Sequence, residues 1–399
     1  MLSLFSDEVR RNPYPAYARV REATPLMHDA GSGLYLVFDY AGVNRVLVEH
    51  ETFSSRHGPA DWLIFQDPPR HKQLRALVSK AFTPRSVVNL EGRIGEICRE
   101  LLESAIGCGE MDGGETGRGE LDLAEDFAIP LPMRVIGEML GIPSDRARFK
   151  RWNDVILKVS YLFGAGPNDP EAKVVMSDFY AATAEMNEYL GALLEQRRAE
   201  PRDDLLTRLL EAQIEGERLS QKDILGFFQL LLLAGSETTT NLINNAVLAF
   251  IEFPEQLELL RREPALLEKA IEEVLRYRSP LQWMFRLTRR EVELHGQVIP
   301  EGRIVLAMIG AANHDPKVFA EPQKLEIRRE PNPHLAFGRG DHFCMGAPLA
   351  RLEAKIALGE LIGRIGEIEL ASGEPWEPRK GLHVHGPSRL RIRFGGKHD

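Results

Sequence analysis

The sequence predicts a mainly α-helical protein with a minor β portion. Helical periodicity, in which apolar residues recur three and four positions apart, dominates roughly residues 67–280. Segments that alternate or run β-branched between Gly and Pro residues come from roughly 12–66 and 281–399. A chain of 399 residues favours about two or three domains. The one candidate linker, the glycine-rich stretch 107–119, is more typical of a surface loop.

Individual elements follow from these patterns. The expected strands are short: Gly33–Phe38, Glu120–Leu123, Glu291–Val298 with a turn at Gly296, Ile304–Met308 and Leu390–Phe394. The most regular helical segments are 90–106, 178–198, 224–251, 265–278 and 348–362.

Composition excludes several classes of protein. Fifty basic and 59 acidic side chains give a net charge of -9, which disfavours a nucleic-acid binder. The cysteines Cys98, Cys108 and Cys344 are too few for a disulfide framework, which favours a reducing cytoplasm. The N-terminal segment is charged, and the longest uncharged apolar stretch, Ile224–Ser236, is shorter than the roughly 18 residues of a membrane span. We therefore expect a soluble protein with no membrane partner.

The predicted helix 224–251 has a single charged residue, Glu237, and no polar face. Such a helix is expected to be buried on every side. Its centre, Gly235 to Asn241, is small or polar, so hydroxyl groups that bond back to the main chain should produce a kink or a widened turn. A buried carboxylate is costly unless it is paired or functional. An internally satisfied polar belt and a functional site both fit this pattern.

The stretch 337–353, FGRGDHFCMGAPLARLE, contains the strongest candidate for a functional site. Gly338 and Gly340 allow a turn with positive φ, and Cys344 then stands at the entrance to a helix, where free amides favour a thiolate. A nucleophile, a redox thiol or a zinc ligand would each need partners that this stretch lacks. A single thiolate suits haem iron, because the porphyrin supplies the other four donors. The alternative is a buried structural cysteine.

This stretch resembles the haem-binding signature of the cytochrome P450 family, Phe-Gly-x-Gly-x-His-x-Cys-x-Gly. The matching residues are Phe337, Gly338, Gly340, His342, Cys344 and Gly346. The resemblance extends from about Asn12 to Phe394. It implies a triangular helical prism with haem b between a distal and a proximal helix, and Cys344 as the axial ligand of the iron. Because a cofactor-centred fold draws on the whole chain, we expect one catalytic domain over residues 1–399.

Two further motifs match the same family. The stretch from Ala234 to Thr238 resembles its distal motif. The resemblance implies that Glu237 and Thr238 are catalytic, because a carboxylate and a hydroxyl can deliver protons to bound dioxygen. It also implies that Ala234 lies against the haem. Glu273 and Arg276 resemble its Glu-x-x-Arg motif, with Arg329 as a further partner. Periodicity alone would place this pair on the surface, where it is worth about 0.3–0.5 kcal/mol. The resemblance implies a buried network instead.

Two windows without acidic residues, Pro68–Leu90 and Val274–Arg290, are rich in basic side chains. They are either solvated basic faces or the cations that a cofactor with two carboxylates requires. By resemblance, the partners of those carboxylates are His71, Arg75, Arg286 and His342. Surplus positive charge near Cys344 would also suit an acidic electron donor.

The resemblance implies a monomeric, cytoplasmic, bacterial-type monooxygenase that inserts one oxygen atom of dioxygen into a lipophilic small molecule. Electrons would come from a separate ferredoxin or flavodoxin with its NAD(P)H-dependent reductase, because the catalytic fold leaves no room for a flavin or ferredoxin module in 399 residues and no cysteine cluster for an iron–sulfur centre is present. Two alternatives remain: a peroxide-driven peroxygenase on the same fold, and a haem-based sensor that binds a gas or another ligand.

By resemblance the substrate pocket draws on eight apolar residues: Trp62, Phe65, Leu162, Phe163, Trp283, Met284, Phe285 and Val384. Their character favours a lipophilic ligand without specifying its class. His383 and His385 alternate on a predicted strand, a spacing that can hold a metal, but two ligands without a third are more typical of packing.

Overall fold

The computed structural model describes residues 7–58, 61–108, 119–142, 146–160, 170–214, 216–371, 375–379 and 381–396. The helices are α1 Asp7–Arg11, α2 Tyr14–Ala23, α3 Tyr40–Val48, α4 Arg70–Ala81, α5 Pro84–Val88, α6 Glu91–Cys108, α7 Pro130–Met139, α8 Arg146–Ser160, α9 Pro170–Ala199, α10 Leu205–Glu211, α11 Gln221–Glu252, α12 Pro254–Arg262, α13 Leu267–Tyr277, α14 Ile309–Ala312 and α15 Ala347–Arg364. The strands are β1 Leu26–Asp29, β2 Leu34–Val37, β3 Phe53–Ser54, β4 Gly119–Asp122, β5 Gln213–Ile214, β6 Glu217–Arg218, β7 Met284–Thr288, β8 Val292–Leu294, β9 Gln297–Ile299, β10 Ile304–Ala307, β11 Ile365–Leu370 and β12 Arg391–Gly396.

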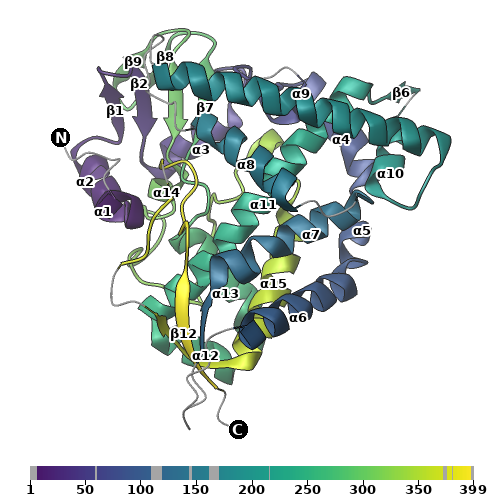
Figure 1. Cartoon of the computed structure of the whole chain (residues 1–399). Helices are drawn as coiled ribbons and strands as arrows, with labels where there is room; N and C mark the ends of the chain where they lie inside the picture. The colour runs from purple at the N-terminus through teal and green to yellow at the C-terminus, as the bar shows by residue number, and fades with distance from the viewer. Residues whose placement is uncertain are drawn as a thin grey trace.

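The predicted mainly helical class with a minor β portion is confirmed. Figure 1 shows a triangular outline in which α9 runs along one edge, the sheet containing β1 and β2 lies at one corner, and β11 and β12 lie at another. None of the helices among the described residues combines the length and the apolar character that crossing a membrane would require.

The larger sheet joins segments that are distant in the sequence. Its strand order is β1-β2-β10-β7-β3. The β2–β10 pairing is parallel, and the other pairings are antiparallel. A second sheet has the order β11-β12-β4, so the C-terminal strand β12 lies between its two partners. The strands at 33–38, 120–123, 304–308 and 390–394 are thus found as β2, β4, β10 and β12, and 291–298 forms the hairpin β8–β9.

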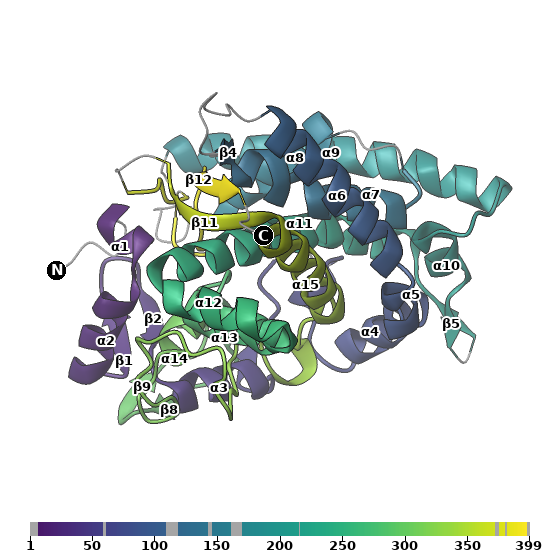
Figure 2. The same cartoon turned by 90° about the horizontal axis from the view of Figure 1, so that it is seen from below.

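One expectation about local structure is wrong, and another falls largely outside the described residues. The predicted strand at His383 and His385 is only an isolated bridge between Val384 and Leu281, because the segment has no neighbour long enough to form a ladder. Of the stretch 107–119, predicted as a loop, residues 109–118 lie outside the described residues. Seen from below, α13 and α15 lie side by side, with α11 behind α15 (Figure 2).

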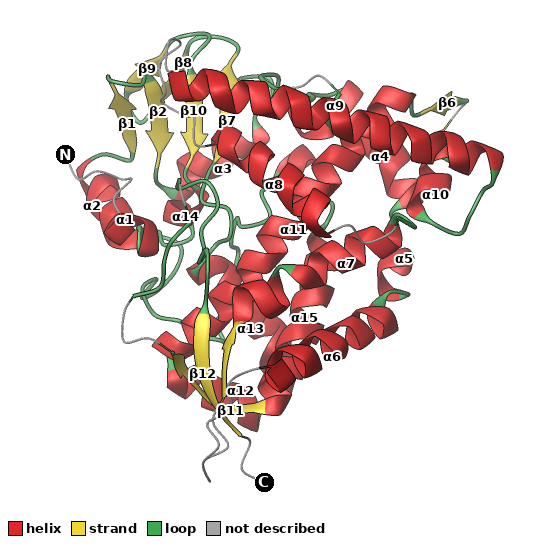
Figure 3. Cartoon of the chain, viewed as in Figure 1, coloured by secondary structure: helices red, strands yellow, loops and turns green. Residues whose placement is uncertain are grey.

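Helix α11 crosses the middle of the molecule between α7, α8, α13 and α15 (Figure 3). It begins with a capping box in which Ser220 and Asp223 satisfy each other's main-chain amides. The hydroxyl groups of Ser236 and Thr238 donate to the carbonyls of Leu232 and Ala234, as predicted. The predicted widened turn is wrong: α11 is one uninterrupted α-helix, because a carbonyl oxygen can accept from a hydroxyl and an amide together.

Candidate active site

Cys344 lies between a glycine turn and the start of α15. Gly338 and Gly340 both have φ of 69°, the left-handed region that glycine adopts without strain. A Cβ on Gly340 would also approach Val48 to 3.2 Å. The amide of Cys344 donates to the carbonyl of Phe337 at 2.9 Å, which closes the loop back on its first residue.

The ionisation of Cys344 differs from the sequence-based expectation. Burial raises the pKa of the Cys344 thiol above its ordinary value. The amides of Gly346 and Ala347, and then the positive charges of Arg75 and Arg351, lower it without reversing the rise. Desolvation of the charged sulfur thus outweighs the helix terminus. A bound metal cation would reverse this balance, because a coordinating thiol is deprotonated outright.

Two imidazoles and two guanidiniums lie close to the Cys344 loop. The rings of His71 and His342 are 4.1 Å apart, and Ser55 Oγ lies 3.2 Å from His342 Nε2. Burial, together with Arg286 and His71, lowers the pKa of His342 to about 2. Burial and Arg75 lower the pKa of His71 to about 4. Both rings are therefore neutral near pH 7.

The positive charge of this cluster comes from Arg75 and Arg286. Arg286 is buried, and burial lowers its pKa to about 10. Its Nη1 donates to the carbonyl of Phe285 at 2.8 Å, and within the described part of the chain neither arginine forms an ion pair with a carboxylate. His71 Nδ1 is buried without a hydrogen-bond partner there. A buried guanidinium such as that of Arg286, with the half-buried Arg75 nearby, requires an anion, so the residues fit a haem that brings two carboxylates.

The distal helix presents two different faces at its centre. Ala234 is exposed and Thr238 half-buried, and their four-residue spacing places them on one face of α11. Ser236 and Glu237 are buried on another face. The prediction that this helix is buried on every side is therefore wrong at Ala234. An apolar pattern around a helix does not specify what each face meets.

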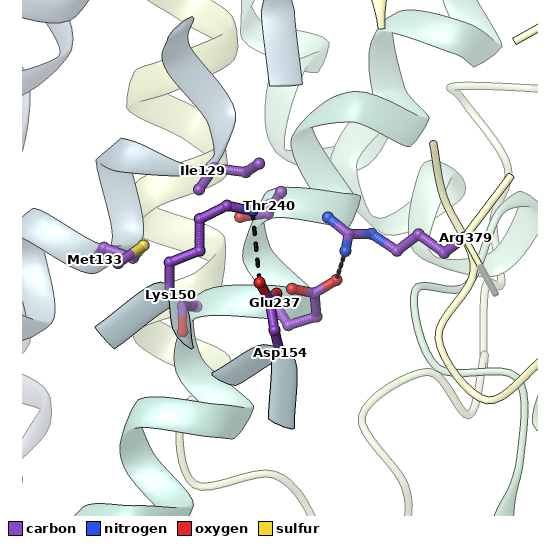
Figure 4. Close-up of a pocket in the computed structure, with 8 residues that line it drawn as sticks. Ile129, Met133, Lys150, Asp154, Glu237, Thr240 and Arg379 are labelled. Carbon is purple, nitrogen blue, oxygen red and sulfur yellow. Dashed lines mark ion pairs between the residues drawn. The ribbon is translucent and has the colours of Figure 1, made fainter. Parts of the chain in front are cut away.

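Glu237 forms an ion pair that the sequence analysis missed. Its Oε1 lies 2.7 Å from Arg379 Nη1, and Asn241 Nδ2 donates to the same oxygen at 3.3 Å. Figure 4 shows this pair facing a second one, Lys150 and Asp154, whose Nζ and Oδ2 are 3.8 Å apart. Between the two pairs lies a cavity of about 20 Å³. That volume holds one water molecule, which would have several polar partners.

The Glu273 network is buried. Both Glu273 and Arg276 have fully buried side chains, and they are joined by two hydrogen bonds of 2.8 and 2.9 Å. Arg329 Nε adds a contact of 3.0 Å to Glu273. Arg276 also donates to the carbonyls of Asn313, Pro322 and Lys324. The surface pair that periodicity alone indicates is therefore wrong, because the segment 313–329 covers that edge of α13.

The aromatic residues proposed for a pocket form one chain of ring contacts. Trp62 stacks on Phe65 at 5.9 Å, Phe65 lies 6.1 Å from Phe285, and Phe285 lies 6.2 Å from Trp283. Met284, which lies between Trp283 and Phe285 in the sequence, is partly buried. Val384 forms an isolated β-bridge with Leu281, two residues before Trp283. Leu162 and Phe163 lie outside the described residues.

Two polar residues of this region were missed. Trp62 Nε1 donates to Gln229 Oε1 of α11 at 2.7 Å, which connects the aromatic group to the distal helix. The ring of His57 lies 3.7 Å from Phe285, and burial lowers its pKa to about 4. An isolated Gln in an apolar helix and a His before a glycine carry no distinctive sequence pattern.

The metal interpretation of His383 and His385 receives no support. His385 Nε2 lies 3.2 Å from the carbonyl of Arg11, and His383 packs on Trp283 with ring centroids 4.2 Å apart. No cluster of metal-ligating side chains occurs among the residues that the structure describes.

Comparison with known proteins places these observations in a family. The model of the family described as Cytochrome P450 matches residues 27–366. "Cytochrome P450 109" of Bacillus spizizenii is 40% identical over 400 residues, which cover 99% of this chain and 95% of that protein. The "Vitamin D(3) 25-hydroxylase" of Pseudonocardia autotrophica is 38% identical, with 98% and 96% covered.

A solved structure gives the same result. The crystal structure of CYP109E1 from Bacillus megaterium in complex with testosterone matches with a TM-score of 0.84 and 38% identity, over 96% of this chain and 99% of that one.

Proposed function

This chain belongs to the cytochrome P450 family and is a monooxygenase, and on that premise we propose that Cys344 binds the iron of a haem b through its thiolate. The observation that supports this assignment is the position of Cys344 at the entrance to α15, beside the buried Arg286 that has no carboxylate partner within the described segments. Haem with a thiolate ligand supplies the activation of dioxygen, the co-substrate.

Four side chains would hold the cofactor in place. Arg75 and Arg286 supply the positive charge that its two carboxylates need. His71 and His342 are neutral, so they contribute hydrogen bonds rather than charge. Phe337, Gly338 and Gly346 belong to the loop that presents Cys344, and Ala234 belongs to the exposed face of α11.

Glu237 and Thr238 would handle protons. Thr238 Oγ1 is held by the carbonyl of Ala234 at 2.6 Å on the exposed face of α11. Glu237 faces the small polar cavity, where Arg379 fixes one carboxylate oxygen. Thr238 would donate its hydroxyl proton toward the oxygen side of the site and regain one from Glu237, which would be reprotonated from water in that cavity.

The substrate would be a lipophilic small molecule. The support is the aromatic group from Trp62 to Phe285, together with relatives whose names or structures include vitamin D3 and testosterone. The test is an optical titration of the haem spin state with testosterone, vitamin D3 and a long-chain fatty acid. We expect at least one of them to shift the spectrum at micromolar concentration. No response to any of the three would overturn the assignment.

Electrons would come from a separate ferredoxin or flavodoxin with its NAD(P)H-dependent reductase, in the cytoplasm. The exposed side chains of Lys72 and Arg339 lie on or beside the Cys344 loop, and their positive charge suits an acidic donor. Turnover with redox proteins and NAD(P)H should exceed turnover with hydrogen peroxide alone. The reverse result would indicate a peroxygenase, and turnover in neither assay would indicate a sensor.

The iron ligand has its own test. The reduced, carbon monoxide-bound protein should show the red-shifted absorption band of thiolate ligation, and Cys344→Ala should abolish it. A band of that type that persists in the Cys344→Ala variant would refute the ligand assignment.

A further inference from the structure

A clamp of charged side chains connects α13 to the beginning of α15. Arg351 donates from Nε and Nη2 to the two carboxylate oxygens of Glu272, each at 2.7 Å. His334 Nε2 lies 3.0 Å from Glu272 Oε2, and the side chain of His334 is 5% exposed. A guanidinium held by a two-pronged contact of this kind has one orientation.

The other surface of the same guanidinium covers an aromatic ring of the cysteine loop. Arg351 Cζ lies 4.5 Å from the centroid of the Phe337 ring, within the range of a cation–π contact. The carbonyl of Phe337 accepts the amide of Cys344. Arg351 therefore touches Glu272 with its edge and Phe337 with its face, and the main chain of Phe337 is hydrogen-bonded to that of Cys344.

Arg351 and Glu272 stabilise each other's charge. Hydrogen bonds to Glu272 raise the pKa of Arg351. Although burial raises the pKa of Glu272, Arg351 and His334 bring it to about 2. Glu272 and Arg351 are thus both charged at every physiological pH.

We propose that Arg351 is a positioning residue that raises the reduction potential of the haem iron. Clamped by Glu272, it holds the Phe337 ring beside Cys344 and stabilises negative charge on the sulfur. A positive charge near the centre favours the reduced state, which carries one more negative charge. This inference rests on the proposed haem ligation by Cys344. It concerns the potential of the centre itself, independent of any donor protein.

The experiment is a spectroelectrochemical titration of the purified haem protein with small mediators and no redox partner. Arg351→Gln removes the charge, and we expect the one-electron reduction equilibrium to become about tenfold less favourable, which is 59 mV. Glu272→Gln keeps the positive charge of Arg351 but removes the carboxylate that holds its guanidinium in place. We expect it to lower the potential by a smaller amount, because the guanidinium can turn away from Phe337 toward water.

The matched control is Lys355→Gln. Lys355 pairs with Glu268 at 2.6 Å, joins the same two helices, and is exposed, so removing its charge should leave the potential unchanged. An Arg351→Gln potential equal to that of the control would overturn the proposal. A Glu272→Gln variant with a raised potential would also overturn it, because the carboxylate would then act through its own charge.

Two measurements keep these outcomes interpretable. If the Arg351→Gln variant does not retain haem, the potential of the Glu272→Gln variant alone tests the proposal, because that variant still contains the guanidinium of Arg351. If the parent protein lacks the thiolate absorption band of the reduced carbon monoxide complex, the proposed function fails before any variant is compared. The two failures are therefore distinguishable.

Discussion

Glu273→Gln is the most direct test of how the cofactor half of the fold is held together. The substitution preserves shape and removes one negative charge. It leaves the fully buried guanidinium of Arg276, and beside it that of Arg329, without their shared carboxylate. Breaking a buried pair by removing one partner costs about 3–5 kcal/mol.

The size of this effect follows from the length of the chain. The entropy of unfolding, about 2.1 cal/mol/K per residue, amounts to about 0.8 kcal/mol/K for a chain of 399 residues. A loss of about 3–5 kcal/mol therefore lowers the thermal midpoint by about 4–6 °C. Haem content should fall in the same samples, because the network anchors the segment that precedes the Cys344 loop.

The control has the same residues at the same spacing. Glu258 and Arg261 form a pair three residues apart on α12, and the side chain of Glu258 is 61% exposed. Glu258→Gln should cost about 0.3–0.5 kcal/mol, or about half a degree. The assay is far-ultraviolet circular dichroism during heating of the haem-loaded protein. A Glu273→Gln midpoint within one degree of the Glu258→Gln midpoint would refute the reasoning.

Three further predictions concern the distal face and α15. Thr238→Ala should keep haem but divert electrons from NAD(P)H to hydrogen peroxide, while Glu237→Gln slows turnover; unchanged coupling in both would contradict the proton roles. Arg379→Gln removes the 2.7 Å partner of Glu237 and should increase the solvent isotope effect on turnover, whereas Arg389→Gln, in an exposed pair with Asp122, should not. Burial raises the pKa of Glu353 to about 8, from 4.5 in the unfolded chain, so the folded state binds the extra proton between these values. Stability should therefore fall by about 1.4 kcal/mol per pH unit as pH rises through this window. Glu353→Gln should remove that slope in urea unfolding from pH 5 to 9, and parallel curves for the two proteins would contradict it.

Features set by local main-chain geometry could be predicted from the sequence. The positive φ of Gly338 and Gly340 and the place of Cys344 before a helix depend on residues within one short stretch. The hydroxyl bonds of Ser236 and Thr238 likewise involve only the preceding turn. Turns and helix starts are encoded by neighbouring residues, so they could be predicted without knowing which distant segments pack against them.

Features that depend on a distant segment could not be predicted in this way. Arg379 reaches Glu237 from a segment without helical or strand periodicity. The burial of Glu273 depends on the segment 313–324, whose carbonyls bind its partner Arg276. The helical periodicity of α13 carries no information about that segment. The thiolate expected for Cys344 was wrong for the same reason. The helix terminus that lowers its pKa is visible in the sequence, but the neighbours that bury the thiol and raise its pKa are not.

The larger sheet places a demand on synthesis of the chain. Strand β2 needs β10 on its open side, and β10 is made roughly 270 residues later, about 15–50 s at ribosomal speed. Until then its backbone groups form an unpaired edge, the kind of surface that recruits other chains. The N-terminal region therefore cannot complete its sheet while the middle of the chain is being translated. Its yield in a host cell should depend on chaperones that cover that edge.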